Sequence, residues 1–239
     1  LFISLTSISL AQSPAGIGNA DGSDGQPKLV MWLDASVLSL NNDDLVSEWT
    51  DLSGNSNHAT QLNSSNQPVF KTNSLNGKPV ISFDRTSDNF LEFDGNTIAN
   101  SDYTFTFIAT RHSDNYRRLV VGGHTNSANR NLHLYFNGSN SFNSHHWGND
   151  FNGTFVSTSE TYSSGTSIDS YGIFSALLES GAASNHRRVY QNNTLLGTRN
   201  VSTQLSDFNG AAFARFSTNR GSSYEYHDIS LAEVITYAD

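Results

Sequence analysis

The segment Ser141–Phe151 (SFNSHHWGNDF) gathers residue types that are well suited to holding a sugar. Within it lie His145, Trp147, Asn149 and Asp150. A sugar site needs an aromatic ring against the apolar face of the pyranose and amide or carboxylate groups for its hydroxyls. This segment supplies both kinds of group, so it predicts a glycan-binding cluster.

Two residues on a preceding strand could extend this cluster. His133 and Tyr135 are two positions apart, so a β-strand places them on one face. His145 and His146 are adjacent and would point to opposite faces if the strand continued through both. A structural interpretation is also open, with Trp147 packed into the core and the histidines exposed. Zinc is not predicted, because no third ligand has suitable spacing.

Oxygen-rich loops suggest a second kind of site. Ca²⁺ takes six to eight hard oxygen ligands, and the turns of this chain are rich in Asp and Asn. The candidate ligands are Asp51, Asn55 and Asp228. Asp34 and Asp51 also suit an alternative role as turn-capping carboxylates, because Asx side chains bond the backbone two residues on. The sequence therefore leaves two roles open for Asp51, calcium binding and turn capping.

The motifs of a hydrolase are absent from the sequence. Retaining glucanases place two carboxylates about 5 Å apart, typically from alternate residues of one strand. Only Glu92 is followed two positions later by a carboxylate, that of Asp94, and no third acid completes the E-x-D-x-E or E-x-D-x-x-E string of such enzymes. A G-x-S-x-G elbow and an H-E-x-x-H helix are also missing. Glu233 lies in an apolar strand and should be paired or hydrogen-bonded. We therefore expect no enzyme, with a glycan-active enzyme as the minor alternative.

Composition limits the partners. The 239 residues carry a formal net charge of −9, which disfavours nucleic-acid backbones and anionic membranes. The same charge disfavours strongly anionic polysaccharides unless Ca²⁺ bridges the two. The chain has no cysteine, which excludes disulfides and thiolate chemistry. Aromatic residues make up 11% of the chain, enough for a sizeable core.

Short segments of alternating polarity predict an all-β, antiparallel fold. In Tyr103–Phe107 aromatic residues alternate with threonines, which places the rings on one face of a strand. Similar short runs separated by Gly, Asn and Ser continue along the chain. A single domain of this length is usual for β-sandwiches.

The N-terminal residues are expected to lie outside this domain. Residues 1–12 are apolar at first, uncharged, and too short to span a bilayer, so they are interpreted as the remnant of a secretory signal peptide. A first β-strand is the alternative. Residues 13–27 are Gly-rich and predicted to be a linker. The domain is assigned to 28–239, and other domains of a longer chain are candidate partners.

Several motifs carry a resemblance to a known family. They are W-L-D-A at Trp32–Ala35, W-x-D-x-S-G-N-x-N-H-A-T at Trp49–Thr60, the segment Asn76–Asp84, a hairpin at Arg188–Gly197 and the closing strand Tyr226–Tyr237. Together they resemble concanavalin A-like lectin/glucanase domains of the laminin-G-like kind, which occur in bacterial secreted and surface proteins. The resemblance implies an antiparallel, two-sheet jelly-roll sandwich whose terminal strands pair and whose concave face holds ligands.

The sequence thus predicts a non-catalytic carbohydrate-binding or adhesion domain, secreted or at the cell surface, with a glycan as its partner. The alternative is a structural module of a larger surface protein without a sugar ligand. A lectin should expose aromatic residues on its concave face. A structural module should have that face filled or covered.

Overall fold

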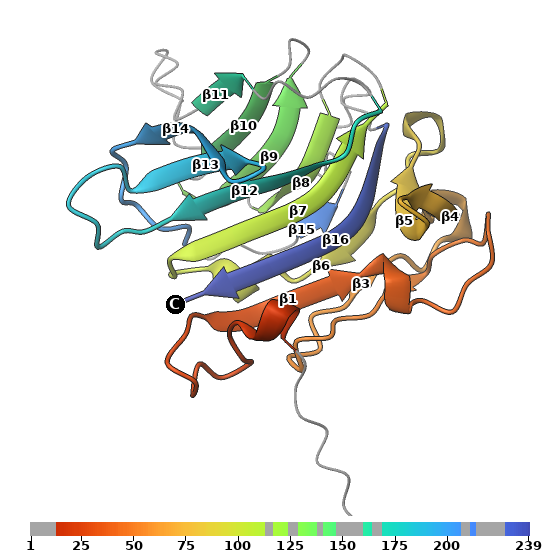
Figure 1. The fold of residues 1–239 in the computed structure, drawn as a ribbon, viewed down its shortest axis with the longest axis horizontal. Helices are drawn as coiled ribbons and strands as arrows, with labels where there is room; N and C mark the ends of the chain where they lie inside the picture. The colour runs from red at the N-terminus through yellow and green to blue at the C-terminus, as the bar shows by residue number, and fades with distance from the viewer. Residues whose placement is uncertain are drawn as a thin grey trace, which may run out of the picture.

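The computed structural model describes residues 13–112, 117–123, 129–137, 141–146, 160–163, 169–206, 211–213 and 228–239. They form two packed β-sheets with antiparallel pairing throughout, which confirms the predicted all-β sandwich (Figure 1). The described helical segments are short 3₁₀ turns: η1 (Pro14–Gly16), η2 (Ala35–Val37), η3 (Ser64–Asn66), η4 (Arg85–Ser87) and η5 (Gly95–Ile98). None of these is long and apolar enough to cross a bilayer.

The first sheet, called sheet A, contains both ends of the domain. Its order is β14 (Thr194–Arg199), β13 (Arg187–Gln191), β12 (Gly172–Leu178), β7 (Tyr103–Arg111), β16 (Ile229–Ala238), β5 (Lys78–Phe83) and β4 (Val69–Leu75), with β1 (Lys28–Asp34) also paired to β16. The first and last strands therefore lie side by side, as the resemblance implied.

The second sheet, called sheet B, is built mainly from the middle of the chain. Its order is β11 (Glu160–Ser163), β10 (Ser141–His146), β9 (Asn131–Asn137), β8 (Arg117–Gly123), β15 (Ala211–Phe213), β6 (Leu91–Phe93), β3 (Ala59–Thr60) and β2 (Glu48–Trp49).

The core lies between the sheets and is strongly aromatic. On β7, Phe105 and Phe107 are fully buried and stack with their ring centroids 5.5 Å apart, while the intervening threonines are half-exposed. Phe174 of sheet A meets Phe136 and Phe142 of sheet B at 4.8 and 5.4 Å. The alternation expected in Tyr103–Phe107 is therefore confirmed, and it places these aromatic rings in the core between the two sheets.

Two polar contacts also join the sheets near one end. The Tyr103 hydroxyl lies 2.5 Å from His146 Nε2, and both residues are buried. Arg187 Nη2 donates to the Ser144 carbonyl at 2.9 Å and to its hydroxyl at 3.1 Å. Buried polar groups need such partners, and these fix β10 against sheet A. His146 therefore belongs to the core, which excludes it from an outward-facing cluster.

The predicted linker packs on the sandwich. The Tyr237 hydroxyl donates to the Ile17 carbonyl at 2.9 Å, and the Leu29 amide donates to the Asn19 carbonyl at 2.8 Å. Gly18 has φ +72°, and a Cβ there would lie 2.6 Å from the Tyr237 ring. Residues 17–19 thus form part of the edge of the domain. The Gly-rich composition predicted a flexible linker, but composition alone could not show this contact with the sandwich.

Candidate functional site

The predicted glycan cluster is only partly within the described residues. Trp147, Asn149 and Asp150 lie outside them, and so does the side chain of His145. Strand pairing sets His145 opposite His133 and Asn143 opposite Tyr135. The structure therefore places these two strands side by side, with a register that the sequence did not predict.

His133 and Tyr135 are buried, which the sequence did not indicate. They alternate along β9 with Leu132, Leu134 and Phe136, which are in the core between the sheets. They therefore lie on the outer face of sheet B, yet their exposed fractions are only 2% and 6%. His133 Nε2 lies 3.1 Å from the Asn131 Oδ1 atom. Neither ring is a solvent-exposed platform, because alternation gives the face of a residue and not how deeply that face is covered.

The three predicted calcium ligands do not converge. Asp51 accepts four hydrogen bonds of 2.7–2.9 Å, from the amides of Trp32, Ser53 and Asn57 and from the Ser53 hydroxyl. Asn55 Nδ2 donates to the Leu29 carbonyl at 2.8 Å. These bonds tie the turn to β1, which is the alternative role predicted for Asp51.

Asp228 lies far from this turn. It directly precedes β16, whereas Asp51 bridges Leu33, the partner of Val234. Between positions 228 and 234 a strand covers about 20 Å, so these carboxylates cannot share an ion. In the described part of the chain no three His, Asp or Glu residues are grouped to hold a metal. Calcium remains a prediction, without support from this set of ligands.

Three polar side chains are hydrogen-bonded in series on the outer face of sheet A. His112 Nδ1 is 2.6 Å from Asp169 Oδ1, and His112 Nε2 is 2.8 Å from the Ser230 hydroxyl. The connectivity matches that of an acyl-transfer triad. However, Ser230 is only 3% exposed and is also hydrogen-bonded to Tyr171, whose pKa is raised mainly by burial. We interpret these hydrogen bonds as structural contacts that join the ends of β7, β12 and β16.

Glu233 and Trp32 form a second polar contact on this face. Trp32 Nε1 donates to Glu233 Oε1 at 2.8 Å, which confirms the expectation that this carboxyl is hydrogen-bonded. Asp34 is the cross-strand neighbour of Glu233 and caps η2 through Ser36. Burial raises the pKa of the Glu233 carboxyl, the Trp32 bond opposes this, and the charge of Asp34 adds to it.

This raised pKa predicts a pH dependence. Above about pH 4.5 the unfolded chain has released the Glu233 proton while the folded chain still retains part of it, so stability falls as pH rises toward the folded pKa. Glu233→Gln keeps an acceptor for Trp32 and removes the titration. In urea unfolding, we expect the stability of this variant relative to wild type to increase from pH 4 to pH 7. A difference that is constant with pH would contradict this.

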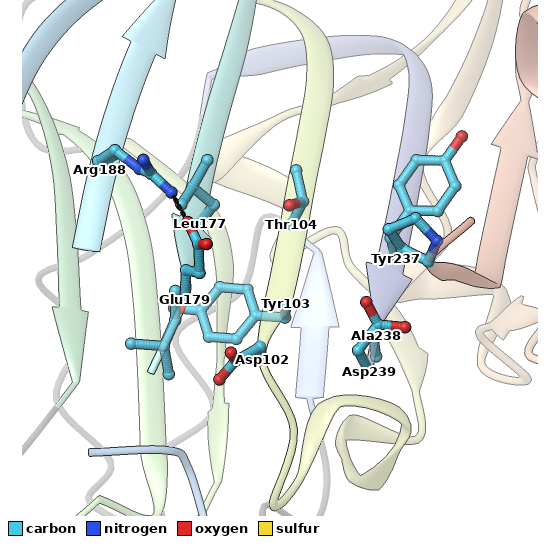
Figure 2. A pocket seen from close by; sticks show the side chains of 11 residues that line it. Asp102, Tyr103, Thr104, Leu177, Glu179, Arg188, Tyr237, Ala238 and Asp239 are labelled. Atoms are coloured by element: carbon cyan, nitrogen blue, oxygen red, sulfur yellow. Dashed lines mark hydrogen bonds and ion pairs between the residues drawn. The ribbon is translucent and has the colours of Figure 1, made fainter. Parts of the chain in front are cut away.

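A depression of about 280 Å³ opens at the end of the outer face of sheet A (Figure 2). One row of cross-strand neighbours forms its floor, namely Tyr237 on β16, Thr104 on β7, Leu177 on β12 and Arg188 on β13. All four are partly exposed. Strands are about 4.8 Å apart, so the row extends about 14 Å. It offers an aromatic ring, a hydroxyl, an aliphatic side chain and a guanidinium in a line.

A second row on the same face is acidic. Asp102 and Asp239 exchange backbone hydrogen bonds of 3.0 Å, and Glu179 continues the β12–β7 register opposite Asp102. Glu179 forms an ion pair with Arg188, which Figure 2 shows across one side of the depression. The three carboxylates and Arg188 give the depression a negative balance.

Asp102 is the most firmly held of these acids. Partial burial would raise the pKa of its carboxyl, but hydrogen bonds from Gln204, Ser180 and Gly181 outweigh burial and lower the pKa. The Gln204 amide lies at 2.9 Å and the Ser180 backbone amide at 2.8 Å. Asp102 is therefore ionised at neutral pH. The sequence did not reveal this site, because its residues come from five separate segments that only strand register aligns.

Comparisons with known proteins identify the fold. No protein-family model matches the chain, and no curated protein does. Among solved structures, Trypanosoma rangeli sialidase in complex with sialic acid matches 98% of the chain at TM-score 0.60 and 16% identity. The chain spans only 34% of that sialidase. The receptor-binding domain of botulinum neurotoxin type G matches 87% of this chain and 47% of its own at TM-score 0.56 and 11% identity.

A smaller neighbour has nearly the same extent as this chain. The CBM40 of Ruminococcus gnavus IT-sialidase, bound to α2,3-sialyllactose, matches over 88% of this chain and 92% of its own. Its TM-score is 0.51 and its identity is 11%. At such identities these likenesses establish a β-sandwich of the lectin type and nothing about the ligand of this chain.

Proposed function

We propose that this chain is a non-catalytic carbohydrate-binding domain of a secreted or cell-surface protein, with a concanavalin A-like jelly roll. The observation that carries the proposal is the floor of the depression, where Tyr237, Thr104, Leu177 and Arg188 lie in one cross-strand row. Apolar surface and hydrogen-bonding groups alternate along it, as a short oligosaccharide requires.

The side chains of this row are held in place, which also favours sugar binding there. The row lies on paired strands, and the Tyr237 hydroxyl is bonded to Ile17 while Glu179 holds Arg188. Side chains fixed before binding lose less conformational entropy when a ligand arrives. The solved neighbours include a carbohydrate-binding module whose bound ligand is a glycan, and that favours sugar among the ligand classes.

The test is a glycan-array screen of the full chain, followed by titration of any glycan bound. We expect Tyr237→Ala to lower affinity roughly 10-fold or more, since a single aromatic contact can carry much of the binding energy. Tyr237→Phe, which keeps the ring, is the matched control and should stay within about threefold. Circular dichroism should show both variants folded.

The parallel variant Trp147→Ala tests the cluster predicted from sequence. Loss of binding in Trp147→Ala, with Tyr237→Ala unaffected, would move the site to Ser141–Phe151 and leave the carbohydrate function standing. Repeating the screen with EDTA tests the calcium prediction, since a calcium-dependent site would lose its ligand.

A structural module is the second candidate. The burial of His133 and Tyr135 favours it, because the described part of that face presents no free aromatic ring. If a folded chain bound no glycan in any condition, this function would replace the first.

A further inference from the structure

An acidic row lies beside the floor of the depression. Asp239, Asp102 and Glu179 lie directly beyond the ends of three adjacent strands and on the same face as Tyr237, Thr104 and Leu177. Like charges directly opposite one another on a sheet repel and destabilise it. Among the described residues that line the depression, Arg188 is the only basic one, and Glu179 already pairs with it.

The three carboxylates are spread along a line. Adjacent strands lie about 4.8 Å apart, so the backbones of the first and third acids are about 10 Å apart. No metal-holding group was found in the described ranges. A ligand that spreads several positive charges along a line fits this arrangement better than one compact cation.

We infer that the depression binds a glycan built of amino sugars, whose protonated amines lie along the carboxylate row while the rings contact Tyr237 and Leu177. This inference rests on the proposed carbohydrate-binding function. An ammonium group donates charge-assisted hydrogen bonds to carboxylates. A sugar acid would meet the same carboxylates with its own negative charge, so the ligand class differs from the sialylated glycan held by the R. gnavus neighbour.

Asp239 is the acid best placed to receive such an amine. Its Oδ1 accepts a long 3.3 Å bond from the Lys28 backbone amide, and its side chain is exposed. Asp102 and Glu179, by contrast, are engaged by Gln204, Ser180 and Arg188. Neutralising Asp239 therefore removes charge from the depression without breaking the bonds that shape it.

The experiment compares three probes by calorimetry: an oligomer of glucosamine, the fully N-acetylated oligomer of the same length, and α2,3-sialyllactose. We expect the glucosamine oligomer to bind at least about 10-fold more tightly than the other two at low salt. The preference should shrink at about 1 M salt, where the screening length falls to about 3 Å.

Two variants locate the effect. Asp239→Asn should weaken glucosamine binding about 10-fold and leave the N-acetylated oligomer unchanged. Asp88→Asn is the matched control, because it removes one charge elsewhere at a position with φ +51° that Asn adopts readily. It should change affinity by less than about twofold.

The outcomes separate this inference from the function on which it rests. Equal affinity for the acetylated oligomer, or a preference for sialyllactose, would overturn the amino-sugar assignment and keep carbohydrate binding. Equal losses in the Asp239 and Asp88 variants would mean that the overall charge attracts the amine, and would also overturn it. Binding of no glycan at all would remove the proposed function and this inference together.

Discussion

Asp51→Ala is expected to lower the free energy of unfolding by about 3–5 kcal/mol. The substitution removes the acceptor of four hydrogen bonds and leaves the backbone amides of Trp32, Ser53 and Asn57 without it. Asp51 is 7% exposed and Ser53 is fully buried, so water cannot readily replace the carboxylate. Each buried donor left unsatisfied costs about 1–3 kcal/mol. Urea unfolding followed by tryptophan fluorescence measures the loss.

Asp94→Ala is the matched control for this prediction. Asp94 caps the 3₁₀ turn η5, but it is exposed, and its side chain accepts one bond from the described residues, donated by the Asn96 backbone amide. Its removal should cost roughly 0.5–2 kcal/mol. If Asp51 instead bound calcium, EDTA would lower the stability of the wild type and leave the Asp51 variant unaffected. We expect EDTA to leave the contribution of Asp51 unchanged, because its acceptor sites are occupied by protein donors.

Phe174→Ala should cost about 3–5 kcal/mol, the range for truncating a buried aromatic residue. Phe174 is fully buried and its ring meets Phe136 and Phe142 across the sandwich at 4.8 and 5.4 Å. The cavity left by the missing ring would separate β12 from β9 and β10. The measurement is the urea midpoint, with an unchanged denaturant slope showing that the fold is retained.

The neighbouring residue provides the control for Phe174. Ile173 is on the same strand but points to the outer face, where 47% of its surface is exposed. Ile173→Ala should therefore cost less than about 1 kcal/mol. Similar losses at both positions would contradict the packing of β12 on sheet B. The comparison thus tests which face of β12 points into the core, as well as how much the Phe174 contact contributes to stability.

The features that sequence predicted well are those set by neighbouring residues. The alternation in Tyr103–Phe107 indicated a strand with one aromatic face, and that face forms the core. Asp34 and Asp51 cap turns through bonds to residues two positions on, so local spacing was enough to predict their role. The bond expected for Glu233 followed from the cost of burying a carboxyl, although the sequence did not name Trp32 as the donor.

The candidate sites were predicted less well, because they depend on the register between strands that are distant in the sequence. His133 and Tyr135 lie on the predicted face, but their burial depends on what covers that face. Asp51 and Asp228 are both residue types suited to calcium, but Asp51 pairs with Leu33 of β1 and Asp228 precedes β16, so the two carboxylates lie apart.

The sequence by itself determined the all-β class, the facing of individual strands and the capping of its turns, since each is decided within a few residues. Only the tertiary structure decided that Tyr237, Thr104, Leu177 and Arg188 form one row beside three carboxylates. Hydrogen bonding between strands up to 133 positions apart, as between 104 and 237, sets that row. A slip of one residue in the pairing of any one of these strands would turn that strand's side chain in the row to the other face.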